Sequence, residues 1–317
     1  MLAYIQRRLF AVVPIALGVT VICFALVYLA PGDPIQSILP PDADAETVDR
    51  LKHLYGLDQP LPFQYLNWLG RVLVGNFGNS IATGRPVLDE IGRSLGNTVL
   101  LSLLSILTAF PLAILLGTIA GYRAGGWLDR VVTGTAILGV SVPNYWLGIV
   151  LVIIFAVEYQ LLPASGMGPG TGPFNPLDWN QLRFVILPVI TLSMIPVGII
   201  ARTARASIAE VMAQDFVVTL RANGLPERMA IRHVLKNALP SVLAVMGLQF
   251  GTLMGGSILV ETVFAWPGTG FLLSKAILAR DIPVLQGTIL VLAMIFVVTN
   301  LLVDLVQTSI DPRIKRV

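Results

Sequence analysis

Six long stretches of this sequence contain no Asp, Glu, Lys or Arg, and they constrain the fold more than any other feature. They comprise residues 9–32, 94–122, 131–157, 184–201, 237–260 and 282–303. A helix of about 20 apolar residues crosses the hydrocarbon core of a bilayer. Charged residues make up 12% of the chain, about half the share typical of a soluble domain. The sequence therefore predicts an all-α membrane protein with six transmembrane helices. It excludes an ordinary soluble enzyme, a disordered protein and, with Cys23 as the one cysteine, a disulfide scaffold.

The first uncharged stretch and residues 159–177 could each be mistaken for another kind of segment. The first stretch follows Arg7 and Arg8, as the core of a signal peptide does, but it is longer than such a core and has no small-residue cleavage site. We expect a retained helix. Residues 159–177 are also uncharged, but they contain four prolines and four glycines, which predicts a loop. Kinks or loosened turns are expected where prolines interrupt the spans, at Pro111, Pro143, Pro188 and Pro196.

Basic residues are concentrated on one side of the predicted spans. That side carries Arg7, Arg8, Arg123, Arg130, Arg202, Arg205, Arg221, Arg228, Arg232, Lys236, Arg313, Lys315 and Arg316. Most acidic residues lie on the other side. Cytoplasmic loops carry an excess of Lys and Arg. We therefore expect both termini and the loop over residues 202–236 to lie in the cytoplasm.

The loop over residues 31–93 is too long to be a plain connection. Helical patterns at residues 46–55 and 64–73, separated by Pro60 and Pro62, predict a small external cap of short helices on the membrane surface. The expected organisation is a first transmembrane helix over residues 1–30, a periplasmic cap over 31–93, and a core of five transmembrane helices over 94–317. The internal loop of that core spans residues 202–240.

The internal loop is predicted to form two short helices joined at a glycine. Asp215 is the expected N-cap of the first helix, and Asn223 with Gly224 is the expected stop, because glycine adopts the left-handed conformation at low cost. Pro226 and Glu227 favour a new helix start.

This helix is expected to end where Pro240 marks the start of the fifth span, and the loop is expected to present Phe216 and Val217 beside a basic surface. The residues alone leave two interpretations open: a solvated basic loop, or a docking surface for a cytoplasmic partner.

Small residues recur at helical spacing in two spans. Gly247, Gly251 and Gly255 share one face of the fifth, and Ala113, Gly117 and Gly121 share one face of the second. Such faces allow close approach of helices in lipid. Packing within the chain and lining of a pathway or dimer interface are both compatible with this pattern.

Other functional classes have little support in the sequence. The two histidines, His53 and His233, lie in loops on opposite sides of the membrane, and no zinc-binding spacing or phosphate-binding glycine loop is present. These observations argue against a membrane enzyme. Ion-coupled carriers use buried ionisable residues, internal repeats and broken helices. Asp304 and Glu261 lie near span ends, and neither repeats nor broken helices are expected.

Several motifs together resemble one family: the inner-membrane permease subunits of bacterial ABC importers for dipeptides, oligopeptides and nickel. The family's loop signature, a Glu-Ala-Ala triplet followed by glycine, corresponds to DFVVTLRANGL at 215–225 and RHVLKNALP at 232–240. The triplet positions carry Val218, Thr219 and Leu220, so its glutamate is absent. Further resemblances follow in order along the chain, at residues 4–9, 29–34, 55–61, 75–87, 141–146, 261–270, 281–284 and 311–314.

The resemblance implies a type I ABC importer permease fold in the bacterial inner membrane. It implies a second permease subunit, paralogous or identical, two cytoplasmic ATPase subunits that use ATP and Mg²⁺, and a periplasmic or lipid-anchored binding protein. The chain itself is then expected to be no enzyme, with no catalytic residue, metal or cofactor of its own. Dipeptides, oligopeptides, glutathione and nickel chelates are all compatible substrates. The coupling contacts to the ATPases are expected at Asp215, Phe216, Thr219, Arg221, Ala222, Gly224, Leu225, Glu227 and Arg228.

Overall fold

The computed structural model describes residues 2–29, 58–169, 174–175 and 177–310, together with positions 44, 46, 50 and 53. The expected helix at 46–55 and the motifs at 29–34 and 311–314 therefore lie largely or wholly outside the described residues, as do positions 55–57 of the motif at 55–61. The chain divides into two compact units. The larger unit comprises Val99–Trp266 and Val298–Val317, and the smaller comprises Leu2–Thr98 and Pro267–Val297. Helices α4 (Val87–Tyr122) and α12 (Ile282–Ile310) have residues in both units.

All six stretches predicted to span the membrane are helical where they are described, except at Val142, Pro143 and Ser257. Helices α4, α7 (Trp179–Met212), α9 (Glu227–Gly256) and α12 are each long and apolar enough to cross a bilayer. Helix α1 (Leu2–Leu29) has 28 residues, which corresponds to a length of about 42 Å. The third stretch forms α5 (Trp127–Ser141) and α6 (Asn144–Leu151), and α6 continues as the π-helical segment η2 (Val152–Glu158).

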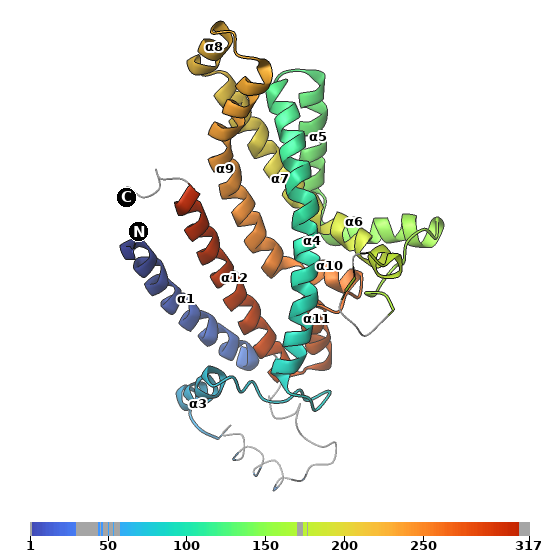
Figure 1. Ribbon diagram of the computed structural model, residues 1–317. Helices are drawn as coiled ribbons and strands as arrows, with labels where there is room; N and C mark the ends of the chain where they lie inside the picture. Colours follow the sequence, from blue (N-terminus) through green and yellow to red (C-terminus); the bar gives the residue numbers. More distant parts are fainter. Residues whose placement is uncertain are drawn as a thin grey trace. The chain divides into compact units, whose positions relative to one another are not determined.

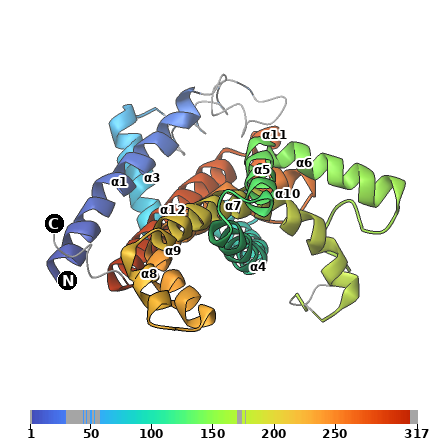
Figure 2. The same ribbon diagram turned by 90° about the horizontal axis from the view of Figure 1, so that it is seen from above.

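The third span is broken, which corrects the expectation that no broken helix is present. The axis of α5 and the axis of the segment Asn144–Glu158 differ in direction by 99°. Val142 is extended, with φ −88° and ψ 125°, because the ring of the following Pro143 disfavours helical backbone at the preceding residue. Figures 1 and 2 both show α6 and η2 projecting away from α5 and α7.

Two helices continue beyond the predicted membrane boundaries. Helix α7 runs through Pro188 and Pro196 and ends at Met212, so residues 202–212 are helical rather than part of a loop. Helix α9 begins at Glu227 and continues through Pro240, so the expected cytoplasmic helix and the fifth span are one helix. The connection between α7 and α9 is therefore short, and it contains helix α8 (Asp215–Ala222).

The larger unit is held together mainly by α7, which packs against α5, α6 and α9 and, at Gly117 and Gly121, against α4. One apolar cluster joins Ala113 of α4 and Ile208 of α7 to Val217 of α8 and Val234 of α9. A second cluster surrounds Trp266, which is fully buried, and includes residues of α4, α7, α9 and the short helix α10 (Ile258–Val263). The described part of residues 159–177 that precedes α7 forms turns and bends, as expected for a loop.

The smaller unit contains α1, α3 (Leu61–Leu73), α11 (Thr269–Ala279) and parts of α4 and α12. Its core includes Val87 and Ile91 of α4, Ala276 of α11 and Val284 of α12. Helix α3, which the sequence predicted at 64–73, contacts α1. The hydroxyl groups of Tyr65 and Thr20 lie 2.8 Å apart, and Phe24 meets the rings of Tyr65 and Trp68.

Candidate functional site

The segment from Asp215 to Arg228, called the elbow below, forms a helix, a tight turn and a second helix start. The sequence had predicted Asp215 as the N-cap of the first helix. Helix α8 instead begins after Gln214, so Asp215 is its first helical residue. There its carboxylate still lies near the positive end of the helix dipole. Gly224 has a φ of +74°, as expected for a glycine that ends a helix. The Leu225 amide donates to the Leu220 carbonyl over 3.2 Å, and α9 starts immediately after Pro226.

The apolar side of α8 anchors the elbow to the rest of the larger unit. Val217 is fully buried in the cluster with Val234 of α9 and Ile208 of α7, and Phe216 packs partly buried against the same cluster. The sequence had predicted that Phe216 and Val217 are presented beside a basic surface, and this is wrong for Val217. The outward side of α8 carries Val218, which is 63% exposed. The exposed coupling candidates are Asp215, Thr219, Arg221, Ala222, Gly224, Glu227 and Arg228, and Leu225 is half-buried.

Three polar side chains from three helices meet on the elbow. The Arg221 guanidinium at the end of α8 donates from Nη2 to Oε1 of Glu227 over 2.7 Å. The hydroxyl of Tyr122, the last residue of α4, donates to the same oxygen. The hydrogen bond to the Glu227 carboxylate raises the pKa of the Arg221 guanidinium, so Arg221 stays positively charged. Sequence analysis selected Arg221 and Glu227 but missed Tyr122, which is 105 residues from Glu227 along the chain.

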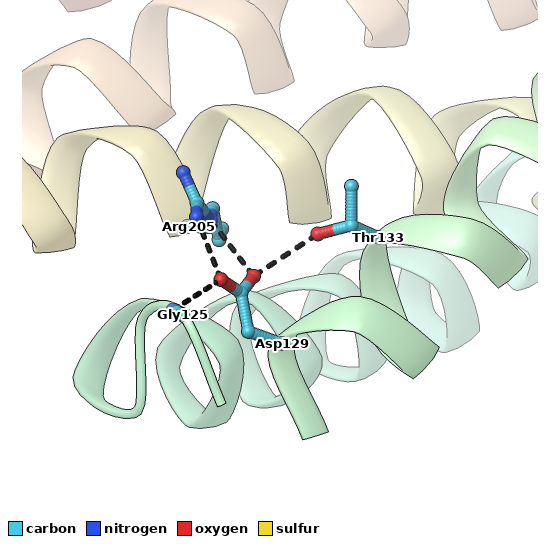
Figure 3. Close-up of polar contacts among 4 residues, drawn as sticks. All are labelled: Gly125, Asp129, Thr133 and Arg205. Carbon is cyan, nitrogen blue, oxygen red and sulfur yellow. Dashed lines mark hydrogen bonds and ion pairs between the residues drawn. The ribbon is translucent and has the colours of Figure 1, made fainter. Parts of the chain in front are cut away.

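A second ion pair ties α5 to α7 in the larger unit (Figure 3). Asp129 is 4% exposed. It accepts from Nε and Nη2 of Arg205 over 2.8 and 2.6 Å, from the Gly125 amide over 2.8 Å, and from the Thr133 hydroxyl over 3.1 Å. Each carboxylate oxygen thus has two donors, which offsets the cost of burying its charge.

Sequence analysis treated Arg205 as a loop residue and did not select Asp129. The missed signal was the apolar pattern Ala201, Ala204, Ile208 and Val211, which continues the helical periodicity of α7 past the predicted end of the span. A helix that extends this far places Arg205 beside the first turn of α5.

The glycine faces lie at close helix contacts within the larger unit. A Cβ atom on Gly117 would lie 2.5 Å from Cβ of Ala204, and one on Gly121 would lie 2.8 Å from the Arg205 carbonyl oxygen. Both glycines therefore let α4 approach α7 closely. A Cβ atom on Gly251 would lie 2.8 Å from Oδ1 of Asn300, while Gly247 and Gly255 are half-buried.

The described residues contain no candidate metal site beside the elbow. Among the described residues, no group of three or more His, Cys, Asp or Glu side chains could hold a metal ion. Glu261, which the sequence placed near the end of the fifth span, is fully buried in α10 and accepts from the Ser257 hydroxyl. The elbow, in contrast, is buried at Val217 on its inner side and exposes charged and polar side chains on its outer side.

Two families match the sequence in consecutive segments. Residues 113–316 match the binding-protein-dependent transport system inner membrane component family, and residues 1–117 match the N-terminal family of the same membrane components. The dipeptide transport system permease protein DppB of Alkalihalophilus pseudofirmus is 38% identical, with 99% of this chain and 100% of that protein covered. The glutathione transport system permease protein GsiC of Escherichia coli is 37% identical, with 99% of each chain covered.

The fold is also found in a solved transporter structure. A chain of the inward-facing MetNI methionine ABC transporter superposes with a TM-score of 0.58 at 16% identity, covering 70% of this chain and 96% of that one. This similarity confirms the predicted type I importer permease fold. The family matches favour a transport permease over the alternatives of a membrane enzyme and an ion-coupled carrier. The elbow, the apolar helices and these matches lead to one conclusion: the chain belongs to the inner-membrane components of binding-protein-dependent transport systems, the permease subunits of ABC importers.

Proposed function

We propose that this permease subunit carries di- or oligopeptides across the inner membrane, in a transporter driven by ATP hydrolysis on separate subunits. The observation that carries the proposal is the full-length similarity to a dipeptide permease, at 38% identity over 99% of this chain. Family members of this kind act with a second permease, an ATPase and a binding protein. Here we propose a paralogous permease as the partner, two ATPase subunits and a periplasmic or lipid-anchored binding protein.

The elbow is the proposed contact with the ATPase subunits. Its inner side is anchored by Val217, and its outer side exposes Val218, Thr219 and the basic Arg221 and Arg228. A rigid, anchored helix pair can transmit movement of a partner to the helices that it joins, here α7 and α9. The permease itself then needs no ATP, Mg²⁺ or other cofactor, because the ATPase subunits bind and hydrolyse the nucleotide.

The proposed topology places the elbow and both termini in the cytoplasm. The elbow lies at the same end of the larger unit as the turn between α4 and α5, which carries Arg123 (Figure 1). A concentration of basic residues at this end supports a cytoplasmic location. Residues 31–93, which carry eight of the 18 acidic residues, are then the periplasmic cap.

Glutathione is a second candidate substrate, because a glutathione permease is 37% identical over nearly the whole chain. Glutathione is itself a tripeptide derivative, so the two candidates share backbone amide and carboxylate chemistry. The choice between them rests largely with the binding protein.

Uptake into proteoliposomes tests the proposal. The permease pair, the ATPases and the binding protein encoded beside this chain are reconstituted, and a mixture of isotope-labelled di- and tripeptides is offered outside. We expect accumulation only with ATP at the ATPase side, and displacement by excess unlabelled peptide. Uptake driven by an ion gradient without ATPase subunits would contradict the proposal, and displacement by glutathione alone would select the second candidate.

A further inference from the structure

The elbow is joined to α4 by the hydrogen bonds of Glu227. Oε1 of Glu227 accepts a hydrogen bond from Arg221 of α8 and another from Tyr122 of α4. Arg221 and Glu227 flank the turn at Gly224, so their ion pair closes this turn. Tyr122 adds a bond from this closed turn to a helix that is not adjacent to it in sequence.

Helix α4 is in turn firmly packed in the larger unit. Gly117 and Gly121, which lie five residues and one residue before Tyr122, bring α4 close to α7. Helix α5 is fixed to the same part of α7 through Asp129 and Arg205. The elbow is flanked in sequence by α7 and α9. A displacement of the elbow that is passed to α4 therefore also acts on helices other than these two.

We propose that Tyr122, Arg221 and Glu227 form a polar clamp that couples movement of the elbow to α4, and that Tyr122 and Glu227 are positioning residues for transport. This inference rests on the proposed function, in which an ATPase docks on the elbow. It assigns Arg221 and Glu227 to the orientation of the elbow, where sequence analysis had expected direct contacts with the ATPase.

The clamp is partly exposed to water, so we expect it to contribute little to the stability of the fold. The side chains of Arg221 and Glu227 are 43% and 45% exposed, and ion pairs at such exposure contribute little to the free energy of unfolding. An ATPase on the elbow would exclude water from the clamp, and hydrogen bonds strengthen in a less polar environment. Loss of the clamp should therefore change coupling more than folding.

The variant Tyr122→Phe removes one hydroxyl and tests the clamp in the complete reconstituted transporter. The readout is uptake of the labelled di- and tripeptide mixture per ATP hydrolysed. We expect this ratio to fall about threefold. A buried hydrogen bond to a charged group would give a larger decrease, but this site is partly exposed to water. The melting temperature and the rate of ATP hydrolysis should remain those of the wild type.

A matched control and a second variant complete the test. Tyr159→Phe removes a hydroxyl that has no hydrogen-bond partner within the described part of the chain, and it should leave the ratio unchanged. Glu227→Ala removes the acceptor for both Arg221 and Tyr122, so it should lower the ratio at least as far as Tyr122→Phe. The double variant should be no worse than Glu227→Ala alone, because the bond that Tyr122→Phe removes is already lost in Glu227→Ala.

The outcomes distinguish the clamp from the function on which it rests. A wild-type ratio in Tyr122→Phe, or independent additive effects of the two changes, would overturn the clamp while ATP-driven uptake by the wild type upholds the function. Absence of ATP-driven uptake in the wild type would overturn both.

Discussion

Replacing Gly224 by tryptophan is expected to lower transport per ATP hydrolysed about tenfold or more, while the protein remains inserted in the membrane. Gly224 has a φ of +74°, and a side chain at such a backbone position costs about 1–2 kcal/mol, which corresponds to roughly tenfold in a rate or an equilibrium. The large ring would also lie on the exposed turn where we propose that the ATPase docks. ATP hydrolysis itself should continue, because its catalytic residues belong to another subunit.

The control variants separate backbone strain from bulk. No atom lies within 4 Å of a Cβ built on Gly224, so Gly224→Ala tests strain with little steric contact. Gly224→Asn introduces a residue that tolerates the left-handed conformation better, and it should retain more transport than alanine. Normal transport by Gly224→Trp would count against the elbow as the element that links hydrolysis to transport.

The second large effect is expected on stability, from Gly117→Leu. A Cβ atom at this position would lie 2.5 Å from Cβ of Ala204 and 2.7 Å from the Ala201 carbonyl oxygen, which is backbone and cannot rotate away. The larger side chain must push α4 from α7, and overpacking of this kind costs about 3 kcal/mol. Thermal unfolding of the purified chain in detergent should show a markedly lower midpoint.

Gly96 provides the matched control for this change. It lies in the same helix, α4, and a Cβ atom there meets nothing within 4 Å. Gly96→Leu should therefore leave the unfolding midpoint unchanged or raise it slightly, because leucine has the higher helix propensity. An equal loss of stability in both variants would show that the close contact at Gly117 is not the cause.

The helices were predictable because lipid leaves few alternatives to a continuous apolar helix. The long uncharged stretches located all six predicted transmembrane segments, but the residues at which the helices end depend on packing. Helix α7 continues to Met212 because Ala204, Ile208 and Val211 bury their side chains against neighbouring helices. Of the four prolines expected to kink or loosen the spans, Pro143 lies at the break between α5 and α6. Helices α4 and α7 continue as helices through the other three.

The candidate site was predictable in its local part only. The turn at Gly224 follows from local conformational preference, which a short sequence motif contains. The orientation of Val217 and the partners of Glu227 and Asp129 depend on helices that are distant in sequence, so no local pattern indicates them. The small residues at 117 and 121 indicated close packing, but the structure was needed to show that α7 is the neighbour.

Site-specific photocrosslinking shows directly whether the elbow receives the ATPase. A photoreactive residue in place of Val218, whose side chain is 63% exposed on α8, reports what lies against the elbow in the assembled transporter. The same residue at Leu161, which is 66% exposed outside the elbow, serves as the control. The account predicts a crosslink from position 218 to the ATPase subunit and none from position 161. An assembled, transport-competent complex in which position 218 gives no crosslink to the ATPase would contradict it.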